Sequence, residues 1–146
     1  MMCGPDCLAY LFPPATAAEI ARACGTDESG TRLGAMAQWV ETQRRVADVR
    51  EHLTWDDLRA YALAYRVIVP WWSIFDEDGK RANAGDGHYS VVLGVNAFFI
   101  ALYDPDIGGV RNLPRAVFEA HWYDFEIRPD GTRHDYLCAA LLITQP

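Results

Sequence analysis

Residues 87–104 of the chain read GHYSVVLGVNAFFIALYD, two apolar runs rich in β-branched and aromatic residues with a short break between them. Residues 88–95 and 98–103 each have the composition of a β-strand, and a connection of two residues joins antiparallel neighbours. The stretch therefore predicts a β-hairpin. With its turn centred on the break, His88 and Asp104 fall opposite one another, at a Cβ separation of about 4.5–5.5 Å. The spacing predicts a hydrogen-bonded His–Asp pair. An ordinary strand histidine and an ordinary turn aspartate are the structural alternatives.

The chain ahead of this hairpin is mainly helical in pattern, and the rest is mainly strand. A capping box at residues 16–19 opens one helix, which Gly25 ends, and Thr54 caps another. Helices are expected over residues 4–11, 17–24, around 33–40, 55–65 and 113–122, and strands over residues 46–50, 67–72, 88–95, 98–103 and 136–144. Residues 73–87, rich in Asp, Gly and Asn, are predicted to be the longest loop, either flanking the substrate or merely connecting two strands. Helices packed on an antiparallel sheet make an α+β fold.

Composition limits the possible functions. The 146 residues are 51% hydrophobic and 12% aromatic, which predicts a single globular domain over residues 1–146. A net charge of -7 argues against nucleic-acid and anionic-membrane partners, because both would be repelled. The sequence has neither an apolar run of membrane-spanning length nor the pattern of a secretory signal, so a cytoplasmic protein is expected.

Cys3 stands where the apolar helical pattern of residues 2–11, MCGPDCLAYL, begins, and Pro5 falls in the first turn, where proline is tolerated. The first N–H groups of a helix have no intrahelical partner, and the positive end of the helix dipole stabilises a thiolate. Cys3 is therefore the candidate nucleophile. A cysteine, a histidine and an aspartate in this order can form a thiol protease site.

The other cysteines have simpler interpretations. Cys24 and Cys138 lie in apolar patterns, where a free buried thiol is more common than a disulfide. Cys7, one helical turn after Cys3, is expected in the core. A zinc site formed by Cys3, Cys7 and His88 is an alternative, but the spacing lacks the usual paired ligands, so neither a metal nor another cofactor is expected.

Four motifs in order resemble a known family. They are CGPDCLA from Cys3, GHYSVVLG from Gly87, LYDP from Leu102, and Leu113-Pro114 followed by Phe118 and Trp122. This pattern is similar to that of the bacteriocin-processing (double-glycine leader) cysteine peptidases and their stand-alone bacterial relatives, which are papain-like. The resemblance implies an N-terminal helical lobe that carries the nucleophile helix and packs on a C-terminal antiparallel β-sheet.

The resemblance also implies roles for three residues. Cys3 would attack the amide carbonyl, His88 would act first as general base and then as general acid, and Asp104 would orient the histidine. The backbone N–H of Cys3 would hold part of the oxyanion. The substrate would be a peptide or protein, with a double-glycine leader as the family's target, and association with a transporter is a further possibility.

One departure leaves alternatives open. Family members carry a glutamine six residues before the nucleophile, a position that here falls before Met1, and losing one oxyanion donor typically costs about 10²–10³ in rate. Three explanations are open. The start of the protein lies upstream of Met1, another residue supplies the oxyanion donor, or the domain is weakened and binds a peptide without cleaving it. In a rival enzyme hypothesis, removal of Met1 and Met2 exposes Cys3 as the terminal nucleophile of a glutamine amidotransferase, which leaves His88 and Asp104 without a role.

Overall fold

The computed structural model describes residues 2–75 and 80–146, the side chains at 82–84 excepted. The elements run in the order α1 (Cys3–Leu11), α2 (Ala17–Cys24), α3 (Leu33–Thr42), β1 (Ala47–Arg50), α4 (Trp55–Ala64), β2 (Tyr65–Phe75), β3 (Arg81–Val95), β4 (Phe99–Asp104), β5 (Gly109–Pro114), α5 (Arg115–His121), β6 (Tyr123–Ile127), β7 (Arg133–Leu137) and β8 (Ala140–Thr144). The predicted mixture of helices and an antiparallel sheet, an α+β fold, is confirmed.

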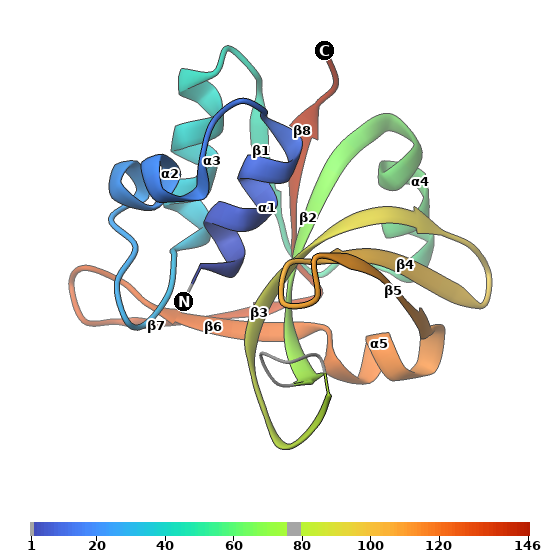
Figure 1. The fold of residues 1–146 in the computed structure, drawn as a ribbon. Helices are drawn as coiled ribbons and strands as arrows, with labels where there is room; N and C mark the ends of the chain where they lie inside the picture. Colours follow the sequence, from blue (N-terminus) through green and yellow to red (C-terminus); the bar gives the residue numbers. More distant parts are fainter. Residues whose placement is uncertain (1, 76–79) are drawn as a thin grey trace.

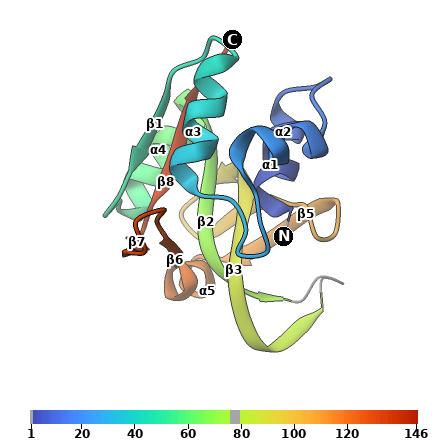
Figure 2. The same cartoon turned by 90° about the vertical axis from the view of Figure 1, so that its left-hand side faces the viewer.

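A six-stranded antiparallel sheet forms the middle layer, in the order β1-β8-β2-β3-β4-β5 (Figure 1). Helices α1, α2 and α3 pack on one face, and α4 and α5 on the other (Figure 2). The expected C-terminal sheet therefore also includes β1 from the N-terminal half, which pairs with β8 at one edge. Strands β6 and β7 form a separate two-stranded sheet.

Strand β2 shows why both faces are covered. Its residues point alternately to opposite faces, and nearly all of them are apolar. Ile68 joins the core beneath α1–α3, whereas Val67, Val69 and Trp71 join the core beneath α4 and α5. A strand that is apolar on both faces must be buried on both, and the helices on either side provide this cover.

The helix boundaries follow from local chemistry. Thr16 Oγ1 accepts the N–H of Glu19, and the Glu19 carboxylate accepts the N–H of Thr16, which is the predicted capping box of α2. Gly25 ends that helix at φ 67°, in the left-handed region that glycine adopts without strain. Thr54 and Asp57 form the same reciprocal cap on α4.

Two sequence predictions about strands are wrong. Residues 136–144 form two strands in different sheets, because Cys138 at φ 50° turns the chain between β7 and β8. The predicted loop over 73–87 is mostly strand, because β2 continues to Phe75 and β3 begins at Arg81; residues 76–79 of that prediction lie outside the described part. The sequence analysis also missed β5 and β6. Both are short, and β6 alternates apolar with acidic residues.

Tyr89 joins the sheet to the helical layer. Its hydroxyl donates to the backbone oxygen of Thr31 at 2.8 Å, in a buried position between α2 and α3. Its ring also lies against Gly4 of α1, where an added Cβ would come within 3.3 Å of the ring. Tyr89 therefore fixes α1 and the α2–α3 loop relative to β3.

We expect Tyr89→Phe to lower the free energy of unfolding by about 1–2 kcal/mol, because the buried carbonyl of Thr31 loses its donor. Urea denaturation of the purified variant measures this loss. Tyr10→Phe is the matched control, since Tyr10 is exposed and should change stability by less than about 0.5 kcal/mol. Equal stability of both variants would contradict the role assigned to the Tyr89 hydroxyl.

Candidate active site

The register of β3 and β4 brings His88 and Asp104 to the same face of the sheet. Val91 pairs with Tyr103, so continuing the ladder places Ser90, not His88, opposite Asp104. The predicted register is wrong by two residues, because the turn closes between Asn96 and Phe99, later than expected, and a bulge follows Val92.

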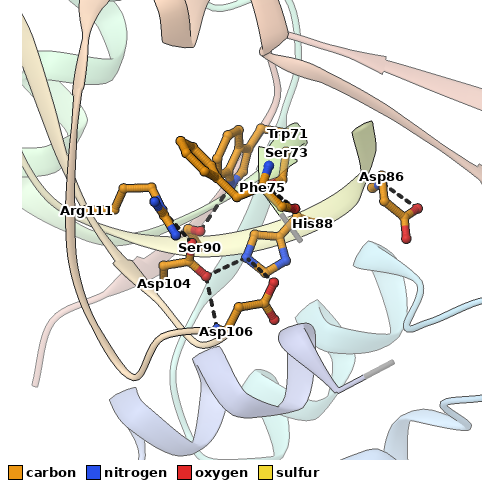
Figure 3. Close-up of polar contacts among 10 residues, drawn as sticks. Trp71, Ser73, Phe75, Asp86, His88, Ser90, Asp104, Asp106 and Arg111 are labelled. Atoms are coloured by element: carbon orange, nitrogen blue, oxygen red, sulfur yellow. Dashed lines mark hydrogen bonds and ion pairs between the residues drawn. The ribbon is translucent and has the colours of Figure 1, made fainter. Parts of the chain in front are cut away.

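Because the register differs from the prediction by an even number of residues, the side chains of His88 and Asp104 stay on one face of the sheet. Long side chains at diagonal positions of two paired strands can still reach each other. His88 Nε2 lies 2.8 Å from Asp104 Oδ1, so the two residues form the predicted hydrogen-bonded pair (Figure 3). Directly opposed positions are therefore not required for this contact.

Asp104 is fully buried and accepts three hydrogen bonds. Oδ1 receives His88 Nε2 and, at 3.0 Å, the backbone N–H of Asp106, while Oδ2 receives Arg111 Nε at 2.8 Å (Figure 3). Burial alone would raise the pKa of Asp104, but the bonds and charge of His88, with those from Arg111 and Asp106, outweigh it and lower the pKa to about 2. The carboxylate is therefore ionised at any ordinary pH.

His88 is buried between Asp104 and Cys3. Burial disfavours the imidazolium, yet the hydrogen bonds and charges of Asp104 and Cys3 prevail and raise the pKa of His88 well above its ordinary value. Nε2 is engaged by Asp104, so Nδ1 is the ring nitrogen left for the cysteine. The ring of Trp71 lies edge-on against the imidazole, with centroids 5.8 Å apart, and helps to exclude water.

Cys3 is the first residue of α1, and it lies near enough to His88 to contribute to the raised pKa of the imidazole; both residues line the same cavity. The N–H groups of Cys3 and Gly4 belong to the first turn and have no intrahelical acceptor, and Pro5 has no N–H. Two N–H groups and the positive helix end therefore lie beside the sulfur, an arrangement that favours negative charge there. The structure brings together all three residues that the sequence selected.

Of the other cysteines, Cys7 lies one helical turn after Cys3 and near Asp104, whereas Cys24 ends α2 and Cys138 lies between β7 and β8. Cys3, Cys7, Cys24 and Cys138, all within the described residues, are free thiols. Cys7 is fully buried in the core, where burial, followed by nearby negative groups, raises its pKa well above the ordinary value, so it remains a neutral thiol. Among the described residues, the side chains near enough to share a metal ion are those of His88, Asp104 and Asp106, a different set from the zinc alternative.

A cavity of about 380 Å³ opens beside Cys3 and His88. Its walls come from the α2–α3 loop, strand β2, the middle of β3 and strand β6. The wall residues include three aromatic side chains and five carboxylates, namely Trp72, Tyr89, Phe125, Asp27, Glu28, Asp86, Asp124 and Glu126. Arg32, whose Nε donates to the Ile127 carbonyl, also lines it. The cavity is large enough for a few residues of an extended peptide and has a negative lining.

Asp124 is a feature of this cavity that the sequence analysis missed. Burial, followed by the nearby charge of Asp86, raises its pKa to about 7, against the opposing hydrogen bonds from the backbone of Phe125 and His88. The carboxylate lies directly on Gly87, where an added Cβ would stand 2.6 Å from Oδ1. The signal was available in β6, where Asp124 lies between two aromatic residues, but that strand was not recognised.

The chain matches no family model, and no curated protein matches it. Solved structures do match. The peptidase domain of Streptococcus ComA, a bi-functional ABC transporter involved in a quorum sensing pathway, aligns with a TM-score of 0.67 at 17% identity, covering 99% of this chain and 92% of that domain.

A double glycine motif protease from an AMS/PCAT transporter, solved in complex with its leader peptide, has a TM-score of 0.62 at 14% identity, over 99% of this chain and 84% of that one. The peptidase domain of Streptococcus mutans ComA has a TM-score of 0.59 at 18% identity, over 98% and 91%. The chain therefore has the fold of these peptidase domains, which confirms the resemblance seen in the sequence at the level of fold. Within the described residues, no helix has the length and apolarity to cross a membrane.

We expect the stability of the protein to depend on Asp104 at low pH. Its pKa is depressed in the folded protein, so its contribution, roughly 2 kcal/mol for a shift from 3.8 to about 2, is fully present above pH 5 and is lost as the pH falls toward 2. Urea denaturation at pH 5 and at pH 2.5 measures this loss.

Asp104→Asn provides the control, because its amide does not titrate. This variant should be less stable than the wild type at pH 5 but should lose about 1–2 kcal/mol less between the two pH values. Parallel losses in the two proteins would show that Asp104 is not held ionised by its partners.

Proposed function

We propose that the protein is a cysteine peptidase that hydrolyses a peptide bond through Cys3, His88 and Asp104. The observation that carries the proposal is the meeting of these three side chains, from α1, β3 and β4, beside a cavity of peptide size. The shared fold with peptidase domains of transporters supports it. The rival amidotransferase mechanism would leave the His88–Asp104 pair without a task.

The reaction begins with proton transfer from the Cys3 thiol to Nδ1 of His88. The thiolate attacks the scissile carbonyl carbon, forming the C–S bond and placing a negative charge on the carbonyl oxygen. The first-turn N–H of Cys3 donates to this oxyanion. When the tetrahedral intermediate collapses, the C–N bond breaks and His88 gives its proton to the leaving amine. Water, deprotonated by His88, then hydrolyses the thioester and restores the thiol.

Asp104 supports both proton transfers. Its Oδ1 accepts the Nε2–H of His88, which fixes the tautomer that presents Nδ1 to the sulfur. Its negative charge also stabilises the imidazolium that forms at each transfer. The site therefore uses a buried carboxylate, and no metal is needed for any step.

The substrate class follows from the neighbours and the cavity. One neighbour is a double glycine motif protease solved with its leader peptide, so we infer that a peptide with a Gly-Gly site is the substrate, and that a transporter is the partner in the cytoplasm. The cavity adds a charge preference, because its carboxylates outnumber its arginine. Cationic side chains near the scissile bond should bind better than anionic ones.

We expect a peptide electrophile that reacts with thiols, such as a Gly-Gly vinyl sulfone, to label Cys3 selectively at pH 7. Cys3→Ala should abolish labelling and cleavage, and His88→Ala should slow both by at least about 10³, because the general base is lost. Intact-protein mass spectrometry measures labelling, and peptide mapping locates it.

Cys24→Ala is the matched control, because Cys24 is a free thiol outside the site and its loss should leave labelling of Cys3 unchanged. Labelling of Cys3 no faster than that of an ordinary surface thiol would reject the peptidase and favour a domain that binds the peptide without cleaving it. An N-terminal Cys3 in the purified protein would favour the amidotransferase.

We expect peptides with Lys or Arg beside the Gly-Gly site to be cleaved about tenfold faster than peptides with Glu there, which corresponds to about 1.4 kcal/mol of binding. The preference should be greater at pH 8 than at pH 6, because the pKa of Asp124 is about 7 and its charge is present only above it. Competition between paired peptides, followed by mass spectrometry, measures the ratio.

Asp124→Asn should remove the pH-dependent part of this preference. Asp130→Asn is the control, since Asp130 lies in the β6–β7 turn and does not line the cavity. Equal cleavage of cationic and anionic peptides at both pH values would show that the cavity does not contact the flanking residues of the substrate.

A further inference from the structure

Arg111 approaches the candidate active site from β5. Leu102 pairs with Arg111 and Asp104 pairs with Gly109, so Arg111 and Asp104 are diagonal neighbours on one face of the sheet. Arg111 Nε donates to Asp104 Oδ2 at 2.8 Å, on the side of the carboxylate opposite His88 (Figure 3). Only 12% of the Arg111 side chain is exposed.

The guanidinium group is also held by an aromatic ring. It lies over Phe75 at the end of β2, with its central carbon 3.7 Å from the ring centroid. Phe75 of β2 contacts the guanidinium group of Arg111 of β5, and Arg111 in turn contacts Asp104 (Figure 3). A planar cation packed against a ring has little freedom to rotate, so its hydrogen bond fixes the rotation of the carboxylate.

We propose that Arg111 is a positioning residue of the peptidase, which keeps Asp104 ionised and turned so that Oδ1 faces His88 throughout the reaction. This inference rests on the proposed function, since it assigns a task within that site. Among the described residues, Arg111 meets the proposed triad at Asp104, so it would act on the reaction through that carboxylate.

The need for a second cation follows from the reaction itself. His88 is positive only while it holds the proton taken from Cys3, and it is neutral after it protonates the leaving amine. Without Arg111, a fully buried Asp104 would then carry a negative charge with no opposite charge beside it, which the low dielectric of the interior strongly disfavours. Arginine retains its charge throughout, so Asp104 remains an acceptor for His88.

Arg111 also limits the charge that Asp104 presents to His88. A carboxylate shared between two cations attracts the imidazolium proton less strongly than a carboxylate paired with His88 alone. His88 can then release its proton to the leaving group more readily. Among the described residues, the groups near His88 and Asp104 that bear on this titration include Cys3 and Cys7 of α1, Asp86 of β3, Tyr103 of β4, Asp106 after β4, and Asp124 of β6.

A purely structural role for Arg111 makes a different prediction. If it only tied β5 to β4, its loss would lower stability and reduce reactivity by the same factor at every pH. If it positions and neutralises Asp104, its loss shifts the titration of His88 upward and changes the pH dependence of Cys3 reactivity. The two roles are therefore separated by pH profiles.

Three variants test the proposal. Arg111→Gln removes the charge but keeps a hydrogen-bond donor, and Arg111→Lys keeps the charge. Arg115→Gln is the matched control, because Arg115 also pairs through Nε with a carboxylate, Glu119, and faces an aromatic ring, but lies outside the site and is 45% exposed. The readouts are alkylation of Cys3 by iodoacetamide between pH 5 and pH 10, and NMR titration of the His88 imidazole.

Arg111→Gln should raise the titration midpoint of His88, shift the pH profile of Cys3 alkylation and reduce cleavage of a Gly-Gly peptide by about tenfold or more. Arg111→Lys should keep the wild-type midpoint and restore cleavage to within about threefold. The proposal is overturned if Arg111→Gln leaves the His88 midpoint and the alkylation profile unchanged. Should Arg111→Gln fail to fold, a shifted midpoint in the folded Phe75→Leu variant supports the proposal, and an unchanged one rejects it.

The outcome separates this inference from the proposed function. Alkylation and NMR need no substrate, so a shifted His88 midpoint in a protein that cleaves nothing would retain the role of Arg111 as partner of Asp104 while rejecting the peptidase. If the wild-type protein cleaves the peptide but Arg111→Gln leaves the titration midpoint of His88 unchanged, the proposed peptidase function is retained and the role of Arg111 is rejected.

Discussion

The buried negative charge of Asp104 is the constraint on which the site depends. A carboxylate without solvent is tolerated only where donors replace the lost water, and here His88, Arg111 and the backbone of Asp106 supply them. These donors belong to β3, to β5 and to the turn after β4, so satisfying one charge ties the three neighbouring strands β3, β4 and β5 together. Two features therefore determine the position of His88. The register of the paired strands sets its approximate position, and the hydrogen bonds of the ion pair set its exact position.

The close packing of α1 on the sheet is a second constraint, and it determines the position of the Cys3 sulfur. At Gly4 an added Cβ would stand 3.0 Å from the sulfur of Met36 and 3.3 Å from the ring of Tyr89, so the helix approaches α3 and β3 at that residue. Because Gly4 follows Cys3 directly, the approach that buries the helix also brings its first N–H groups and the thiol to His88. The packing of α1 and the proposed chemistry therefore depend on the same contact, and any loosening of α1 would separate the candidate nucleophile Cys3 from His88.

Much of this arrangement could be predicted from sequence, and the reasons for the failures are physical. The face shared by His88 and Asp104 was predictable because strand residues alternate, and a register error of two residues does not change the face. Arg111 and Asp124 were not predicted because β5 and β6 are short and were not expected as strands, so their side chains could not be placed. Gly and Asp disfavour strands, so their frequency predicts a loop over residues 73–87. Pairing with β2 outweighs that local preference for most of the segment.

The buried Asp104 and the half-buried Asp124 show how the surroundings of a carboxylate determine its charge. Asp104 has two cationic partners, and its pKa falls to about 2, whereas Asp124 has backbone donors and another carboxylate, Asp86, nearby, and its pKa rises to about 7. The first is therefore a permanent charge suited to holding a histidine, and the second changes charge near neutral pH at the wall of the cavity. Since the charge of His88 acts on the pKa of Asp124, a change in the charge of Asp124 also acts on the histidine. A cationic side chain bound in the cavity would lower the pKa of Asp124 and keep it ionised, so binding of the proposed peptide substrate would also alter the electrostatics of the His88–Asp104 pair.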